Sequence, residues 1–396
     1  MPGRPCAGLQ RILRRELRQI ARYPAWIVML VPAPIALLVV LSLIFSDGLP
    51  TDLPVAVVDL DRTTLSRQAI RMVDATSDVD VALQASSLAI GKEALVAGDV
   101  YAVVYLPENM QRDLLSGRQP EAITFYNNQY LTVGSIVARA TTSALQTFSA
   151  GVSQSALISS GVLPEAAREA LVPISVQTAP LFNPALDYVQ FLLAALMPAT
   201  LQVFMIASAA MAVARDMRVR SGSSRLVTLG RTPFGVLAGK LVPYAVFSLF
   251  SLIVADAIIF GFFGAPFRGS IPVHMCYTVL FVLSCQCFGA VVGTLAGEAV
   301  GALGLSGVLA APAFGFAGVS IPRLTMNTFA WSWGSLLPLV PYLQLRTDQV
   351  SRGVSPEVSL SGFAWLTAQV LIYGSLAALL LWRKSRPRAF GQEGLA

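Results

Sequence analysis

The sequence predicts an α-helical polytopic membrane protein with six transmembrane helices, arranged 1 + 5, and an α/β domain between the first and the second. Hydrophobic residues make up 55% of the chain and charged residues only 13%, whereas roughly a quarter of an ordinary soluble domain is charged. Six windows are apolar over about 20 residues, the length that crosses a hydrocarbon core. The long segment 47–187 is instead rich in acidic residues and alternates between strand-like and helix-like patterns.

The first 24 residues predict an amphipathic helix at the cytoplasmic face of the membrane. Its apolar face carries five side chains, with arginines opposite, as in helices that lie in the membrane interface. These five are Leu9, Ile12, Leu13, Leu17 and Ile20. The first apolar window, 25–45, is longer than the core of a signal peptide, and no small-x-small cleavage site follows it. It is therefore expected to be a retained anchor.

Segment 47–187 predicts an extracytoplasmic α/β domain. Strand-like runs occupy 55–59, 79–83, 101–107 and 122–127, with helix-like stretches at 64–74, 86–98, 108–116 and 131–160, and a last strand-like run at 174–182. None of the four cysteines falls in this segment, so no disulfide framework is expected there.

Two carboxylates, Asp59 and Asp61, end the first predicted strand in "VVDLDRTTLS". They could belong to a metal or phosphoryl-transfer site, but carboxylates at i and i+2 need further ligands that the sequence does not offer. A turn at the strand end, followed by a helix N-cap, is the favoured interpretation.

The remaining spans are expected at 188–214, 241–263, 273–296, 299–320 and 362–382, within a membrane domain of residues 188–382. The window 299–320 gives the weakest signal because it is rich in glycine and proline. Basic residues are concentrated before the first span, in the loop 215–240 and in the tail 383–396, whereas the opposite loops hold only Arg268, Arg323, Arg346 and Arg352. This asymmetry predicts that both termini and the loop are cytoplasmic.

The net charge of +6 follows from this topology and from contact with lipid headgroups, and no nucleic-acid partner is expected.

"GVLAGK" (235–240) resembles a phosphate loop, but it has only three residues between its glycines, and Leu241 replaces the required Ser or Thr. Cys285, Cys287 and the single histidine, His274, form no cluster suited to a metal. The sequence therefore predicts a protein without an enzymatic site, cofactor or metal of its own.

Several stretches, in this order and spacing, resemble the permeases of the type-2 ATP-binding-cassette (ABC) exporters, in the branch with a large extracytoplasmic domain after the first membrane helix. They are "VAVVDLDRTTLSRQAI", "GDVYAVVYLPENMQRDLLSGRQP", "FYNNQYLTVGSIV", "LFNPALDYVQFLLAALMPA" and "RTPFGVLAGKLVPY". Together they extend over almost the whole chain.

The resemblance implies that the loop 215–240 holds a short coupling helix, at 221–233, on which a separate ATPase subunit docks. The residues it assigns to coupling are Arg225, Thr228, Arg231, Thr232 and Pro233. It also implies a bacterial inner membrane location, an ATPase dimer that binds the ATP, a second permease chain and possible hand-over to a periplasmic adaptor. One departure is that "RDMRVRSGSS" keeps Asp216 and Gly222 but lacks the Thr of the Arg-Glu-x-x-x-Gly-Thr pattern common in the family. The alternative is that the arginines only fix topology and contact anionic lipid.

Asp256 is the carboxylate that the sequence places inside a span, where it should face the bundle interior, either on a transport path or bonded to a Ser or Tyr of a neighbouring helix. Gln202 and Gln286 are weaker candidates for the same path, because polar residues often only join helices. Two alternatives to the export permease are a proton-coupled secondary transporter that uses Asp256 and a sensor or scaffold that binds a ligand through its outer domain. Secondary transporters usually contain two related halves, which this chain lacks.

Overall fold

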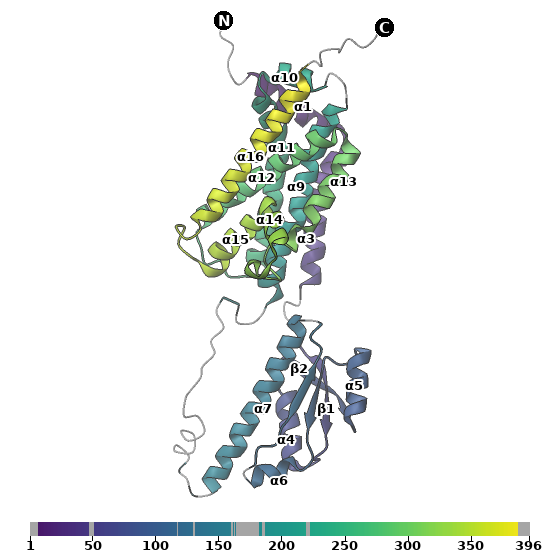
Figure 1. Cartoon of the computed structure of the whole chain (residues 1–396), viewed down its shortest axis with the longest axis vertical. Helices are drawn as coiled ribbons and strands as arrows, with labels where there is room; N and C mark the ends of the chain where they lie inside the picture. The colour runs from purple at the N-terminus through teal and green to yellow at the C-terminus, as the bar shows by residue number, and fades with distance from the viewer. Residues whose placement is uncertain are drawn as a thin grey trace. The chain divides into compact units, whose positions relative to one another are not determined.

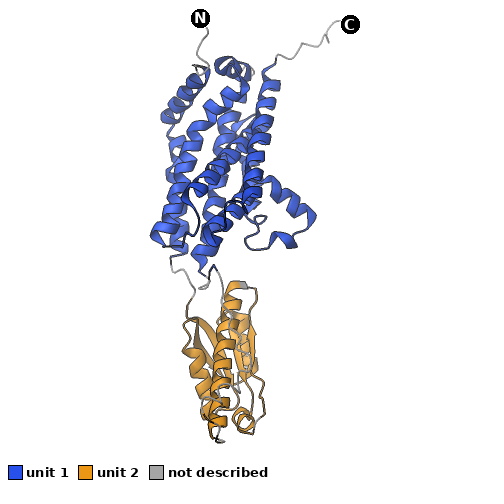
Figure 2. Ribbon diagram, turned by 90° about the vertical axis from the view of Figure 1, so that its left-hand side faces the viewer, with its two compact units in different colours: residues 1–48, 180–396 blue, residues 49–179 orange. Residues whose placement is uncertain are grey.

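The computed structural model describes residues 7–46, 51–116, 118–129, 131–159, 161, 163, 182–183, 187–218 and 222–386. The chain forms two compact units (Figure 2). Unit 1 comprises residues 1–48 and 180–396 and is mainly helical, whereas unit 2 comprises residues 49–179 and combines a sheet with helices.

Unit 2 is built on a four-stranded sheet with the order β2-β1-β3-β4. The strands are β1 (Leu53–Asp59), β2 (Val79–Ala85), β3 (Ala102–Leu106) and β4 (Ile123–Tyr126). Strand β1 pairs in parallel with β2 and β3, and β4 adds to β3 in the antiparallel sense. Parallel strands need crossover helices, which is why the apolar runs alternate with helical ones in the sequence.

Four helices of unit 2 follow the strands: α4 (Thr64–Asp74), α5 (Leu88–Ala97), α6 (Met110–Leu115) and α7 (Leu131–Ser159). Helices α4 and α7 cover one face of the sheet, where Val57, Val104 and Phe148 share a core, and α5 covers the other (Figure 1). Four of the five predicted strands and all four predicted helices are confirmed within a few residues. The predicted strand at 174–182 lies outside the described residues, apart from Phe182.

Both carboxylates at the end of β1 are held by the turn that starts α4. Asp59 Oδ1 accepts hydrogen bonds from the backbone N–H of Asp61 and of Arg62, at 3.1 and 2.9 Å. Asp61 Oδ2 accepts from the Thr63 hydroxyl at 2.5 Å and from the Gln111 N–H at 3.1 Å. Thr63 is the N-cap, in a capping box with Ser66. The strand-end turn is thus confirmed, and the cap residue is Thr63 rather than either aspartate.

Unit 1 begins with α1 (Ala7–Arg22), α2 (Pro24–Leu30) and α3 (Pro32–Ile44) and resumes with the π-helical turn η1 (Val189–Leu193) and α9 (Ala194–Met217). Next come α10 (Gly222–Gly230), α11 (Pro233–Asp256), the π-helical turn η2 (Ala257–Phe262) and α12 (Ile271–Ala296). The chain continues through α13 (Ala299–Ala310), η3 (Ala311–Phe314), η4 (Arg323–Thr325), α14 (Thr328–Leu336), α15 (Leu339–Arg346), η5 (Thr347–Arg352) and α16 (Leu360–Ser385).

Within the described residues, five helices are long and apolar enough to cross a membrane: Pro24–Ile44, Val189–Met217, Pro233–Phe262, Ile271–Ala296 and Leu360–Ser385. Residues Ala299–Phe314 form a shorter apolar helix, so the sixth span predicted at 299–320 remains a prediction. The short helices α14 and α15, which follow it, were not predicted from the sequence. Within unit 1, α1, α10 and the end of α16 lie at one end of the bundle, and α14 and α15 lie toward the other (Figure 1).

Helices α9 and α12 form the tightly packed centre of unit 1. Gly289 and Gly293 of α12 are spaced as in a GxxxG motif, which allows two membrane helices to approach closely. A Cβ atom on Gly293 would lie 2.1 Å from the Ala210 carbonyl oxygen of α9, and one on Gly289 would lie 2.5 Å from that of Ile206. Large apolar side chains such as Phe250 and Ile372 are exposed on the outer helix surfaces, as expected of positions that face lipid.

Candidate coupling surface, buried charge networks and pocket

Helix α10 forms where the coupling helix is expected. Its buried face carries Ser223, Leu226 and Gly230, and the Ser223 hydroxyl donates a hydrogen bond to the Lys384 carbonyl of α16 at 2.8 Å. We call its outer face, with the turn that follows it, the docking surface. It consists of six exposed residues: Arg225, Thr228, Leu229, Arg231, Thr232 and Phe234. Four of the five residues assigned to coupling thus share one surface, and the fifth, Pro233, is the first residue of α11.

Helix α1 packs directly against α10 and α11 because small residues line its path. A Cβ atom on Gly8 would lie 2.9 Å from the Gly230 carbonyl oxygen, and one on Gly239 would lie 2.9 Å from Ile12 Cβ. The packed face of α1 therefore includes Gly8, Ile12 and Ile20, whereas Leu17, predicted on the same face, is 46% exposed.

A buried charge network joins α1, α9 and α11 next to the docking surface. Glu16 is fully buried and accepts hydrogen bonds from Lys240 Nζ at 2.8 Å and from Arg215 Nη2 at 2.9 Å. Arg15 binds both oxygens of Asp216, at 2.6 and 3.0 Å, and Lys240 also pairs with Asp216. The hydrogen bond to Asp216, with the charges of Asp216 and Glu16, raises the pKa of Arg15 although burial opposes the shift. The sequence analysis treated Asp216 and Lys240 as loop residues, whereas the structure places both in helices that cross the bundle.

Glu16 is the member of this network that the sequence analysis missed. Residues Ile12, Glu16 and Ile20 are spaced at i, i+4 and i+8, so they share one helix face, and all three are buried. An acidic residue between two apolar residues on the buried face of an otherwise arginine-rich helix is a signal for an internal ion pair. The spacing could therefore have identified Glu16 without a structure.

A second network surrounds Asp256, the last residue of α11. His274 Nε2 lies 2.7 Å from Asp256 Oδ2, and Arg346 Nη2 lies 2.8 Å from Asp256 Oδ1. His274 also bonds Tyr277, and Arg346 Nη1 donates to the Tyr342 hydroxyl at 3.1 Å. Asp256 thus has structural partners on neighbouring helices, as one of the two interpretations expected, but they are a histidine and an arginine rather than a Ser or Tyr. His274 lies in the first turn of α12.

Gln202 and Gln286 lie apart from this network and act as links between helices. Gln202 Nε2 donates to the Ala310 carbonyl at 3.1 Å, which joins α9 to α13. Gln286 Nε2 donates to the Ser248 hydroxyl at 3.2 Å, which joins α12 to α11. Both are buried. Their role on a transport path stays a prediction.

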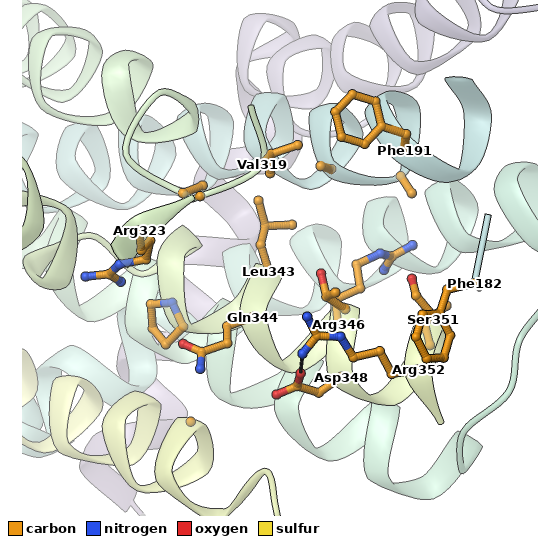
Figure 3. A pocket seen from close by; sticks show the side chains of 18 of the residues that line it. Phe182, Phe191, Val319, Arg323, Leu343, Gln344, Arg346, Asp348, Ser351 and Arg352 are labelled. Carbon is orange, nitrogen blue, oxygen red and sulfur yellow. Dashed lines mark hydrogen bonds and ion pairs between the residues drawn. The ribbon is translucent and has the colours of Figure 1, made fainter. Parts of the chain in front are cut away.

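A pocket of about 730 Å³ lies at the end of unit 1 opposite to α10. Its walls come from η1, η2, the segment 317–324, α14, α15, η5 and the first turns of α16. Figure 3 shows Arg323 on one side and Arg346, Asp348 and Arg352 on the other, with Val319 and Leu343 between them and Phe191 above Arg346. In the described parts of the chain, no group of three or more His, Cys, Asp or Glu residues is placed to hold a metal ion.

The comparisons with known proteins agree with this architecture. A family model described as "ABC-2 family transporter protein" matches residues 24–379. The "Inner membrane transport permease YhhJ" of Escherichia coli (strain K12) is 24% identical over 354 residues, which cover 84% of this chain and 85% of that protein. The protein of the same name from Shigella flexneri matches with the same identity and coverage. No solved structure matches significantly. With five helices suited to crossing a membrane and a family match over nearly its whole length, the chain belongs to the ABC-2 family of transporter proteins.

Proposed function

We propose that this protein is the membrane-spanning permease subunit of an exporter in the bacterial inner membrane. A separate ABC ATPase dimer drives it, and it moves substrate out of the cytoplasm or out of the inner membrane. The single observation that carries the proposal is α10, a short helix that lies at the bundle end where basic residues are concentrated and exposes the docking surface. Basic loops mark the cytoplasmic side, where ATP is available.

The docking surface has the composition of a protein interface. Leu229 is 41% exposed and Phe234 is 60% exposed, beside the charged Arg225. Apolar and aromatic side chains together with arginine are the residues enriched where proteins meet. The inner face of α10 also packs against α1, α11 and α16. A force applied to its outer face would therefore act on the helices of the bundle and not only on a loop.

The double variant Arg225→Glu/Arg231→Glu tests ATPase docking. Reversing two charges at an interface opposes binding in addition to removing contacts, so we expect at least a tenfold loss of co-purified ATPase and of substrate-stimulated ATP hydrolysis. The matched control is Arg67→Glu/Arg71→Glu, which makes the same change at two exposed arginines of α4 in unit 2. Recovery of the ATPase at the wild-type level from correctly inserted double variant would refute docking at this surface.

The working complex is expected to contain two permease chains, either two copies of this chain or this chain with a paralogue. Five or six spans enclose a pathway less readily than ten or twelve, and an ABC ATPase dimer offers two docking positions. The mass of the detergent-solubilised complex tests this stoichiometry. One permease chain per two ATPase subunits would contradict it.

Asp256 gives less support to a proton-coupled transporter. Its two oxygens are already paired with His274 and Arg346 at the end of α11, so a structural role accounts for the residue. A sensor or scaffold would use unit 2, whose strand-end carboxylates are bound by the chain's own turn. A periplasmic adaptor as a partner of unit 2 remains an expectation from the family resemblance.

A further inference from the structure

The pocket at the end of unit 1 opposite to α10 contains a cation, Arg323, that forms no ion pair with any residue that the structure describes. Arg323 Nη2 donates to the Ser335 hydroxyl at 2.8 Å and to the Trp331 carbonyl at 3.2 Å, and its guanidinium lies 5.5 Å from the centre of the Trp331 ring. No carboxylate of the described residues lies within 4.0 Å of it. Burial lowers the pKa of Arg323.

The other charges of the pocket cancel in pairs. Arg352 Nη1 lies 3.1 Å from Asp348 Oδ1, and Arg346 faces Asp256. Arg346 is only 5% exposed and forms an ion pair with Asp256, and its Nε atom has no hydrogen-bond acceptor among the residues that the structure describes. The pocket therefore has a surplus of one positive charge, which lies on Arg323.

The rest of the lining is largely apolar. Val319 and Leu343 lie between the two groups of charges, and Phe191 lies above Arg346 (Figure 3). Trp331 and Trp365 contribute indole rings to the lining. The Trp365 N–H is already used by the Ser335 carbonyl at 3.0 Å, so the ring offers its apolar surface to the pocket. A volume of about 730 Å³ falls in the range of small-molecule sites, about 300–1,000 Å³.

We propose that this pocket binds an amphipathic anion, with a phosphate, sulfonate or carboxylate head at Arg323 and an alkyl or aryl body against Phe191, Leu343 and the two tryptophans. A planar guanidinium that lacks a carboxylate partner recognises such a head through paired hydrogen bonds. A neutral molecule would leave Arg323 uncompensated, and a small inorganic anion would leave the apolar walls exposed to water. The bound molecule can come from the membrane as a lipid or from solution as a free amphiphile. The proposal concerns binding only and does not depend on the ATPase.

The test uses the full-length permease alone, purified in dodecyl maltoside, with Trp26, Trp333 and Trp382 replaced by Phe so that only Trp331 and Trp365 fluoresce. Dodecyl phosphate is the probe. Dodecanol has the same alkyl chain without the anionic head and measures partition into the micelle, and inorganic phosphate has the head without the alkyl chain. We expect a saturable fluorescence change with dodecyl phosphate only. Arg323→Gln should weaken it at least tenfold, whereas Arg268→Gln, an arginine at the same end but outside the lining, should leave it within twofold.

Equal responses to dodecyl phosphate and dodecanol, or wild-type binding by Arg323→Gln, would overturn the proposal. If the tryptophan replacements impair folding, native mass spectrometry of the otherwise unmodified protein and of Arg323→Gln measures the same binding directly. That measurement also separates the two sources. A phospholipid that is retained by the wild type and lost from Arg323→Gln identifies a membrane lipid, and binding of added dodecyl phosphate without retained lipid identifies a free amphiphile. A protein that holds neither molecule refutes the site.

Discussion

Glu16→Gln should be among the most destabilising conservative substitutions in this protein. Glu16 is fully buried and accepts hydrogen bonds from four side chains: Arg15 at 3.1 Å, Arg215 at 2.9 Å, Lys240 at 2.8 Å and Tyr244 at 3.3 Å. The substitution keeps the shape of the side chain, removes its charge and replaces one acceptor oxygen by a donor NH₂ group that faces the donors around it. Asp216 then remains as the single carboxylate against three cations.

The magnitude follows from the cost of leaving a buried charge without its partner. Removing one member of a buried ion pair typically costs about 3–5 kcal/mol, because the remaining charge stays desolvated. We expect a loss in this range for Glu16→Gln. Adding Lys240→Met removes one of the surplus cations, so the double variant should lose less than the sum of the two single losses.

Reversible unfolding of the purified protein in mixed dodecyl maltoside and dodecyl sulfate micelles measures the free energies. Glu298→Gln is the matched control, because Glu298 is the exposed N-cap of α13 at the same end of the bundle. This variant should lose less than about 1 kcal/mol of its free energy of unfolding. Similar losses for Glu16→Gln and Glu298→Gln would refute the reasoning, because the buried network would then contribute nothing beyond a surface carboxylate.

Two further substitutions test the packing of each unit. Gly293→Ala should destabilise unit 1 by about 1–3 kcal/mol in the same unfolding assay, since its Cβ would lie 2.1 Å from the Ala210 carbonyl oxygen. Gly304→Ala, where a Cβ meets nothing within 4 Å, should be neutral or slightly stabilising, and equal losses at the two glycines would contradict the close approach of α9 and α12. Thr63→Ala should lower the free energy of unfolding by about 1 kcal/mol, because the cap with Ser66 is lost. It should also speed amide hydrogen exchange selectively in the first turn of α4. Unchanged exchange there would exclude the cap.

The sequence predicted unit 2 well because its signals are local. Short apolar runs alternate with amphipathic ones, and the residues that begin and end the helices are adjacent in the chain. Ser87 caps the start of α5, and Gly98, with φ of +87°, ends it. Such signals need no knowledge of distant contacts.

The networks of unit 1 could not be predicted in the same way, because their members meet only after the helices pack. Arg346 is 90 residues from Asp256 and was expected in an extracytoplasmic loop, yet it is buried in α15. Helices α14 and α15 contain only 9 and 8 residues, below the length that marks a span, so the hydropathy pattern gave no reason to fold this segment back into the bundle. The predicted coupling loop, 215–240, is also longer than the observed connection, because α11 already begins at Pro233.

Helix α11 is clamped near both ends, by Lys240 in the network of Glu16 and by Asp256 in the network of Arg346. These 16 positions correspond to about 24 Å along the helix axis. Two features lie close to the clamps: Pro243 follows Lys240 by three residues, between the clamps, and the π-helical turn η2 starts directly after Asp256. Proline and π-turns are where helices bend. Residues 244–256 therefore form a helical segment bounded by two sites at which helices commonly bend, and α11 connects the network of Glu16 to that of Arg346, whose side chain lines the pocket.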